Sequence, residues 1–319
     1  MKKLIFLLTF ALMITMFSHN GYAEAVVTDG LVSYWTFDWQ DIAGRTAKDV
    51  WGKNNGTIVG NPKRVAGRVN GALEFDGSND YVNLTNLGDF GNQLGTFTFE
   101  AWIKTSLKGK RWTTLFKVRD ADCAMGWGID LNGWRENPHF PLELERTFLF
   151  DNFLEFGPNF DENINFAKDV IRFYRTNKVA LKLGPPVCQH STHGLQFPIS
   201  DGEWHHLVWV NGGPFVDEDG REWDRESAIY MDGKRKVRGK SRGEPIMFMP
   251  FTEPVYLGAG NNRGEAEGFF NGIIDEVRIY NRPLTADEVT RNFESKIGLS
   301  VEAAKKLPVV WGTLKTTLK

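Results

Sequence analysis

The chain has 319 residues, with 38 Lys and Arg against 40 Asp and Glu, and a formal net charge of −2. Its hydrophobic content of 41% excludes a disordered chain, and the near-neutral charge gives no electrostatic basis for binding nucleic-acid phosphates. The 2 cysteines are too few for a multi-disulfide scaffold. Aromatic residues make up 13% of the chain, beside 33 Gly and 13 Pro. This mixture is typical of β-strands joined by tight turns, so we expect an all-β protein.

The first 23 residues are typical of a secretory signal peptide. Lys2 and Lys3 precede an apolar run from Leu4 to Phe17, and small residues lead to a cleavage position after Ala23. Cleavage after Ala25 and an uncleaved N-terminal anchor are the alternatives. No later apolar run approaches the roughly 20 residues of a transmembrane helix. We therefore predict a mature chain without a membrane span that is secreted, periplasmic or attached to the cell surface.

Short strands are predicted wherever apolar residues alternate with polar ones. In residues 97–104 the phenylalanines share one face with Ala101 and Ile103, and Glu100 and Trp102 share the other, which predicts a half-buried strand. Further short runs of this kind occupy residues 31–37, 72–75, 81–84, 126–131, 170–174, 204–210, 228–231, 255–257 and 273–280. Between residues 228–231 and 234–237, Asp232-Gly233 predicts a type I′ hairpin.

The only clear helix signal follows the last strand. Thr285 and Glu288 fit a capping box, which predicts a helix through Phe293. Since no helix alternates with the strands, we expect two antiparallel sheets packed face to face as a jelly-roll sandwich. Residues 119–200 form an aromatic-rich insertion, and residues 299–319 form a C-terminal tail that is either an extra strand or a loose segment.

Five sequence blocks carry a family resemblance over about residues 30–293. They are residues 71–82 (GALEFDGSNDYV), 97–104 (FTFEAWIK), 201–208 (DGEWHHLV), 229–234 (IYMDGK) and 272–284 (GIIDEVRIYNRPL). Their order and spacing resemble a laminin G-like jelly roll of the concanavalin A-like lectin/glucanase superfamily. The resemblance implies two curved antiparallel sheets and often a structural calcium ion. It implies no single activity, because members bind glycans or proteins, hydrolyse polysaccharides or serve as adhesive modules.

Asp275 is the strongest candidate metal ligand. It is expected in phase with the apolar residues of its strand, where a carboxylate needs a cation or several hydrogen-bond donors. The resemblance places a structural calcium between the first strands and the last one, so Asp38 and the weaker candidate Asp76 are the expected partners. The alternative is that Asp275 pairs with an arginine such as Arg278, or caps a turn.

The sequence offers no recognisable catalytic set. Hydrolases of this superfamily carry three carboxylates in a Glu-x-Asp-x-x-Glu strand, and the nearest imitation, Glu143 and Glu145, lacks the rest. A facing pair made by these residues with Glu155 or Asp161 would favour hydrolysis. We interpret His190 and His193 as loop surface. Of His205 and His206, one is expected in the core and the other exposed.

Three other features have both a functional and a plainer interpretation. Trp127 and Trp134 suit stacking on sugar rings, or else build a local core. Cys123 and Cys188 are expected to form a disulfide after export, with two free thiols as the alternative. The basic run of residues 234–242 suits heparin binding, or else protects a solvated edge strand.

These observations favour an exported, non-catalytic module that binds a polysaccharide or a protein surface and is stabilised by calcium. A carbohydrate-active enzyme, either a hydrolase or a lyase, is the first alternative. A structural adhesive component of the cell surface is the second.

Overall fold

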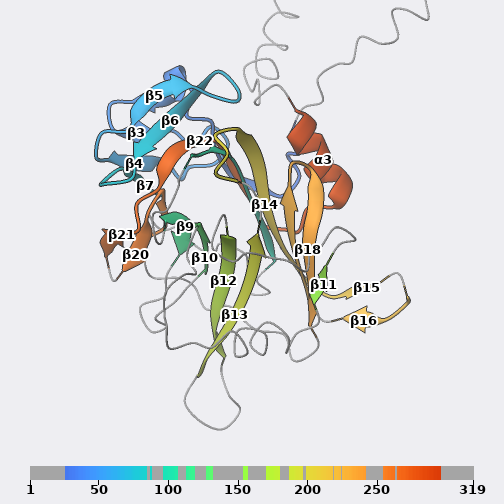
Figure 1. Cartoon of the computed structure of the whole chain (residues 1–319). Helices are drawn as coiled ribbons and strands as arrows, with labels where there is room; N and C mark the ends of the chain where they lie inside the picture. Colours follow the sequence, from blue (N-terminus) through green and yellow to red (C-terminus); the bar gives the residue numbers. More distant parts are fainter. Residues whose placement is uncertain are drawn as a thin grey trace, which may run out of the picture.

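The computed structural model describes residues 26–84, 87, 96–106, 113–118, 127–131, 154–156, 170–179, 187–196, 199–217, 219–223, 225–241, 254–262 and 264–295. Within these residues the chain forms two nine-stranded antiparallel sheets and one α-helix (Figure 1). The expected all-β sandwich with a short C-terminal helix is therefore confirmed. The signal peptide and the C-terminal tail lie outside the described residues.

Sheet A brings the first and last strands of the array together. Its order is β11 (Leu154–Phe156), β18 (Lys234–Ser241), β17 (Arg225–Met231), β14 (Trp204–Gly212), β8 (Phe97–Lys104), β22 (Asn271–Tyr280), β6 (Gly71–Asp76) and β5 (Lys63–Ala66), and β1 (Leu31–Trp35) also pairs with β22. Leu31 is the register partner of Tyr280. The start and the end of the domain are therefore hydrogen-bonded neighbours.

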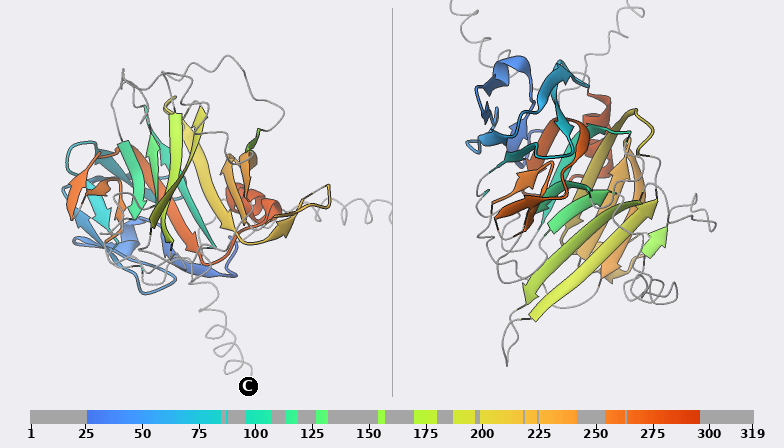
Figure 2. Two further views of the ribbon diagram at one scale, coloured as in Figure 1. Left: turned by 90° about the horizontal axis from the view of Figure 1, so that it is seen from below. Right: turned by 60° about the vertical axis from the view of Figure 1, so that its left-hand side comes forward.

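Sheet B contains three of the four described strands of the aromatic-rich insertion, and the fourth, β11, lies in sheet A. Its order is β13 (Val187–Gln196), β12 (Val170–Val179), β10 (Trp127–Leu131), β9 (Thr113–Val118), β19 (Tyr256–Leu257), β7 (Tyr81–Asn83), β4 (Gly56–Val59), β3 (Thr46–Ala47) and β2 (Ile42–Ala43). The strands predicted at 126–131 and 170–174 are confirmed, and the second continues to Val179. Figure 2 shows the long β12–β13 hairpin, and its left view shows the short hairpin of β15 (Phe215–Val216) and β16 (Glu222–Trp223) projecting from the body. A further short hairpin joins β20 (Gly260–Asn262) and β21 (Glu265–Glu267).

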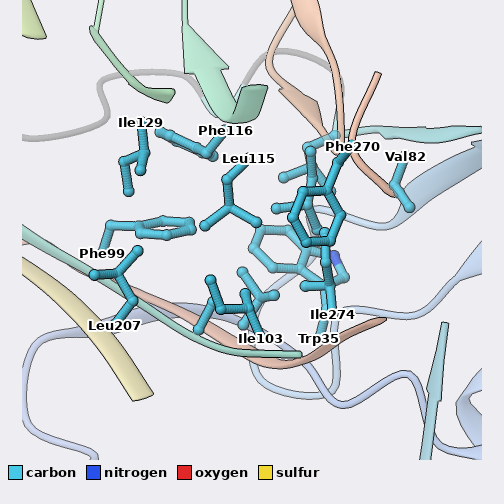
Figure 3. Packing of buried hydrophobic residues seen from close by; sticks show 14 of the residues in the cluster. Trp35, Val82, Phe99, Ile103, Leu115, Phe116, Ile129, Leu207, Phe270 and Ile274 are labelled. Atoms are coloured by element: carbon cyan, nitrogen blue, oxygen red, sulfur yellow. The ribbon is translucent and has the colours of Figure 1, made fainter. Parts of the chain in front are cut away.

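The main core fills the space between the sheets. Phe99 of β8 packs on Phe116 of β9 with ring centroids 4.4 Å apart, and Phe75 meets Phe270 edge to face. Figure 3 shows this packing, in which Trp35, Ile103 and Ile274 of sheet A share the cluster with Leu115 and Ile129 of sheet B. Burial of this apolar surface is the principal force that holds the two layers together.

The other face of sheet A is buried as well. The helix α3 (Ala286–Glu294) and the segment at residues 26–29 lie on it, so a second cluster forms from Val27, Tyr34, Val208, Tyr280 and Val289, among others. As a result β8 is buried on both faces, and the expectation of a half-buried strand was wrong. The cause is tertiary, because α3 supplies the cover from almost 200 residues away along the chain.

Local sequence signals set the start of α3 and the β17–β18 turn. Thr285 Oγ1 accepts from the Glu288 amide at 3.2 Å, and Glu288 Oε2 accepts from the Thr285 amide at 2.9 Å, which completes the predicted capping box. Asp232 and Gly233 have φ angles of 53° and 73°, as a type I′ turn requires. Both predictions are confirmed.

Candidate functional site

A single loop, residues 67–71, contacts both of the strongest candidate metal ligands. Asp38 follows β1, and its Oδ1 accepts from the Gly71 amide at 2.9 Å. Asp275 of β22 accepts through Oδ2 from the amides of Arg68 and Val69, at 2.7 and 3.0 Å. Asp38 is 5% exposed and Asp275 is 0% exposed. The first strand, the last strand and the 67–71 loop therefore meet around two buried carboxylates.

A β-bulge puts Asp275 on the face of sheet A that is turned away from the inter-sheet core. Glu276 has a φ of 53°, and the register between β22 and β8 shifts between Asp275 and Arg278. Asp275 is the register partner of Trp102, while Ile274 and Val277 on either side of the bulge belong to the core. The expectation that Asp275 shares the apolar face of its strand was wrong, because the extra residue of the bulge reverses the alternation.

Asp275 keeps one oxygen unsatisfied in a buried place. Within the described part of the chain its Oδ1 has no hydrogen-bond partner. Burial, together with the negative charge of Glu276, raises the pKa of Asp275 to about 8. Arg278 is not its partner, since that guanidinium pairs with Glu100 and Glu276. The structure thus differs from the alternative in which Arg278 neutralises Asp275.

Backbone strain is concentrated around these two carboxylates. Four non-glycine residues of the described chain have positive φ, and three of them adjoin this site: Phe37 (54°), Asn70 (49°) and Glu276 (53°). Such conformations cost of order 1–3 kcal/mol each and persist where the surroundings impose them. A Cβ on Gly67 would lie 2.5 Å from Asp275 Oδ2, so the loop approaches the carboxylate as closely as only glycine permits.

The side chains at this loop provide too few oxygen ligands for a hard cation, so backbone carbonyl oxygens would have to complete its coordination. In the ranges that the structure describes, no group of three or more His, Cys, Asp or Glu side chains is arranged to hold a metal. Asp38 and Asp275 would thus need carbonyl oxygens to reach the six to eight ligands of calcium. Asp76 is exposed and caps its own turn, accepting from the amides of Ser78 and Asn79 at 2.7 and 3.3 Å.

A buried network of charges lies beside the site and was missed by the sequence analysis. Arg278 Nη1 donates to Glu100 Oε1 at 2.7 Å, and Nη2 donates to Glu276 and to the hydroxyl of Tyr34. The Arg278 guanidinium also lies 4.4 Å from the centroid of the Tyr34 ring. The detectable signal was the polar side of the alternation, which carries Glu100 on β8 and Arg278 on β22.

The same network fixes α3 and residues 26–29 to the sheet. Asn292 of α3 donates through Nδ2 to both Glu100 oxygens at 3.0 Å, and its Oδ1 accepts from the Val27 amide at 2.8 Å. The Tyr280 hydroxyl donates to the Val27 carbonyl at 3.1 Å. Burial alone would raise the pKa of Glu100, but Arg278 and His206 lower it to about 2, so this carboxylate stays ionised.

The two histidines of β14 are both buried, whereas one was expected to be exposed. The His206 ring contacts Trp102 and Phe293, with centroids 5.1 and 6.0 Å away, and these two rings also stack on each other at 5.5 Å. His205 has Asp232 Oδ2 at 2.9 Å from Nδ1 and Asp201 Oδ1 at 3.1 Å from Nε2. The hydrogen bond to Asp232 raises the pKa of His205, despite the opposing effect of burial, and the contact with Asp201 adds to the increase.

One interpretation placed the basic run of residues 234–242 on an edge strand, and the structure shows that this was wrong. β18 lies inside sheet A between β17 and β11, because a segment of the insertion pairs with it. Arg238 is buried, its Nε lies 2.8 Å from Glu226 Oε1, and its guanidinium lies over the Phe215 ring. Arg238 therefore has a structural role and is not exposed for binding an anionic ligand such as heparin.

Several candidate side chains lie outside the described residues, so their expected roles stay predictions. They are Cys123, Trp134, Glu143, Glu145 and Asp161. For four others the structure places only the backbone: Trp127 in β10, Glu155 in β11, and Cys188 and His190 in β13. His193 is also in β13, so the two histidines interpreted as loop surface belong to a strand.

The comparisons with known proteins come from a family model and from solved structures. Residues 158–290 match the family model Laminin_G_3, described as the concanavalin A-like lectin/glucanases superfamily. This match confirms the predicted resemblance over the last three of the five sequence blocks, and the blocks at residues 71–82 and 97–104 precede the matched range. No curated protein shows significant similarity to the sequence.

Three solved structures are similar at low sequence identity. Domain 4 of AbnA, a GH43 extracellular arabinanase from Geobacillus stearothermophilus in complex with arabinotriose, has a TM-score of 0.47 and 19% identity over 84% of this chain and 98% of that one. The binding domain of Paraclostridial Mosquitocidal Protein 1 has a TM-score of 0.45 and 16% identity, covering 83% and 52%. Trypanosoma rangeli sialidase has a TM-score of 0.48 and 16% identity. The similarity covers 86% of this chain and 34% of the sialidase, so the chain spans about a third of that enzyme.

In the part of the chain that the structure describes, no helix combines the length and apolar character needed to span a membrane.

Proposed function

We propose that this chain, in which residues 158–290 carry the signature of the concanavalin A-like lectin/glucanase superfamily, is an exported, non-catalytic module that binds a polysaccharide or a protein surface. A structural calcium ion joins its first and last strands. The family match and the sandwich support the fold, and the function is argued from the site.

The observation that carries the calcium proposal is the unsatisfied Oδ1 of Asp275. This atom is fully buried, and a second carboxylate, Asp38, contacts the same loop of residues 67–71. A buried carboxylate without enough donors is costly, and a divalent cation offsets that cost directly. Asp275, Asp38 and carbonyl oxygens of the loop would hold the ion. Its contribution is structural, since it would fix β22 and the end of β1 to the same loop.

The burial of the acidic residues favours binding over catalysis at this end of the molecule. Glycoside hydrolysis needs two carboxyl groups that reach opposite sides of a sugar bond. Glu100 and Asp275 are 0% exposed and Glu276 is 1% exposed, so none of them can meet a substrate. Their hydrogen bonds to Arg278, Asn292 and the 67–71 loop give all three a structural role.

The expected export of the chain also implies an oxidised Cys123–Cys188 pair. A disulfide that closes a loop of this length contributes roughly 4 kcal/mol by loop-entropy estimates. Intact mass measured with and without reduction decides this point. A gain of two mass units on reduction supports the bridge, and an unchanged mass removes it.

Glycan-array binding with a parallel turnover assay tests the function. The purified protein should bind at least one polysaccharide or glycoprotein in calcium and release no reducing sugar from it. Release of reducing ends would establish the enzyme alternative instead. Silence on the array together with capture of a defined surface protein would favour the adhesive role.

A further inference from the structure

Trp39 is a large aromatic residue with about half of its surface exposed. Among the large apolar side chains that the structure describes, Trp39 is 48% exposed, beside Trp51 at 42% and Val216 at 61%. The Trp51 indole is fixed in place, because its Nε1 donates to the Leu31 carbonyl at 2.8 Å. No hydrogen bond from the Trp39 indole occurs within the described residues. Trp39 therefore leaves about half of its surface open to solvent.

Two carboxamides are held by the buried carboxylate of Asp38, the residue that precedes Trp39. Asp38 Oδ2 accepts from Gln40 Nε2 at 3.0 Å and from Asn70 Nδ2 at 3.2 Å. Asp38 is buried, whereas Gln40 and Asn70 are exposed residues. Each amide keeps a carbonyl oxygen and a second N–H that Asp38 does not engage. The surface around Asp38 thus offers neutral donors and acceptors at fixed positions, one residue from Trp39 in the chain.

The turn that carries Trp39 is rigid before any ligand arrives. The Asp41 amide donates to the Asp38 carbonyl at 2.9 Å, which closes the 3₁₀ turn η1 (Trp39–Asp41). Thr36 Oγ1 accepts from the Asp38 amide at 3.1 Å and donates to Asp41 Oδ2 at 2.8 Å. A surface that is already ordered loses little conformational entropy on binding, so its contacts translate more fully into affinity.

We propose that Trp39, Gln40 and Asn70 form a binding site for a sugar ring of a neutral polysaccharide. The assignment rests on the proposed function and deepens it by placing the ligand. The C–H face of a sugar packs on the exposed indole, and the two amides exchange hydrogen bonds with ring hydroxyls. Carboxamides are uncharged and suit hydroxyl groups, whereas recognition of a uronate or a sulfate calls for arginine or lysine.

Affinity gel electrophoresis with defined polysaccharides tests the site. The gels contain arabinan, xylan, mannan or mixed-linkage β-glucan as neutral probes, and polygalacturonate as the anionic one. Trp39→Ala should weaken binding of the retarding neutral polysaccharide at least tenfold. Trp51→Ala, a matched removal of an exposed indole, should change it less than twofold.

Two further variants remove the amides without disturbing the turn. Gln40→Ala and Asn70→Gly should each weaken binding about threefold or more, and glycine accepts the positive φ of position 70. Unchanged melting temperatures of Trp39→Ala and Asn70→Gly relative to wild type show that the fold is intact.

The outcomes separate this site from the general function. If a neutral polysaccharide retards wild type and Trp39→Ala equally, the proposed site is wrong, but the chain is still a polysaccharide-binding module. Greater loss in Trp51→Ala than in Trp39→Ala also overturns the site. Retardation by polygalacturonate alone overturns the neutral ligand. Wild type that is retarded by none of the five gels contradicts both the site and polysaccharide binding.

Discussion

The two faces of sheet A are both buried, but they are stabilised by different interactions. The inner face packs apolar side chains such as Phe99 and Ile279 against sheet B. The outer face places Glu100 and Arg278, from the same two strands, beneath α3. Apolar packing is non-directional and tolerates similar side chains, whereas a buried charge network fails when one member loses its partner. The outer face therefore determines where α3 and residues 26–29 attach.

The largest effect is expected on the outer face, from Arg278→Met. This change leaves Glu100 and Glu276 buried without their cation and should cost about 3–5 kcal/mol of unfolding free energy. Urea denaturation followed by circular dichroism measures the loss. Adding Glu100→Gln and Glu276→Gln should restore most of it. A loss below about 1 kcal/mol in the single variant would contradict the role given to the network.

A smaller effect is expected on the inner face, from Phe99→Leu. The substitution stays apolar but removes the ring contact with Phe116, so about 1–2 kcal/mol should be lost. The same urea experiment applies. A loss equal to that of Arg278→Met would remove the distinction between the two faces.

Thr285→Ala tests how firmly α3 covers the outer face. It removes the N-cap hydrogen bond to Glu288 and should cost about 1 kcal/mol, whereas Thr285→Ser should be nearly neutral. Hydrogen exchange of the α3 amides gives the local readout. If the amides of both sheets exchange faster in Thr285→Ala than in wild type, with no greater increase in α3, the cap does not act locally on the helix.

The smallest effect concerns pH and His205. The folded-state pKa of His205 is raised above 6.5. Its contribution to the free energy of unfolding is therefore complete below pH 6.5 and is lost as the pH rises through the raised value. Its partly exposed partners Asp201 and Asp232 keep the expected contribution below about 1 kcal/mol. Melting curves of wild type and His205→Gln between pH 5 and 9 should converge as the pH rises. Curves that diverge toward high pH would reverse the sign.

The elements with local signals could be predicted from the sequence. The period-two strands, the Asp232-Gly233 turn and the Thr285 capping box each depend on neighbouring residues, so a single sequence reveals them. The family resemblance implied that the first strands and the last one lie close together, and the structure shows β1 paired with β22.

What could not be predicted depends on tertiary context. A left-handed Glu276 has no local signature, yet it reverses the face that Asp275 occupies. Glu100 and Asn292 meet across 192 positions of sequence, so their hydrogen bond leaves no periodic trace. The interior position of β18 depends on β11, a short segment of the insertion. Asp38 and Asp275 both contact the 67–71 loop, but their role as calcium ligands stays a prediction, and the reasoning about the face of Asp275 was wrong.

The calcium response of Asp275→Asn tests the central claim most directly. Asparagine keeps an oxygen for the amides of Arg68 and Val69 but puts an NH₂ group where the unsatisfied oxygen lies. After EDTA treatment, calcium at about 100 times its Kd should raise the melting temperature of wild type by roughly 5–10 °C and leave that of Asp275→Asn unchanged. If calcium does not change the melting temperature of wild type, or raises that of Asp275→Asn by the same amount, the proposal of a cation at this site is contradicted.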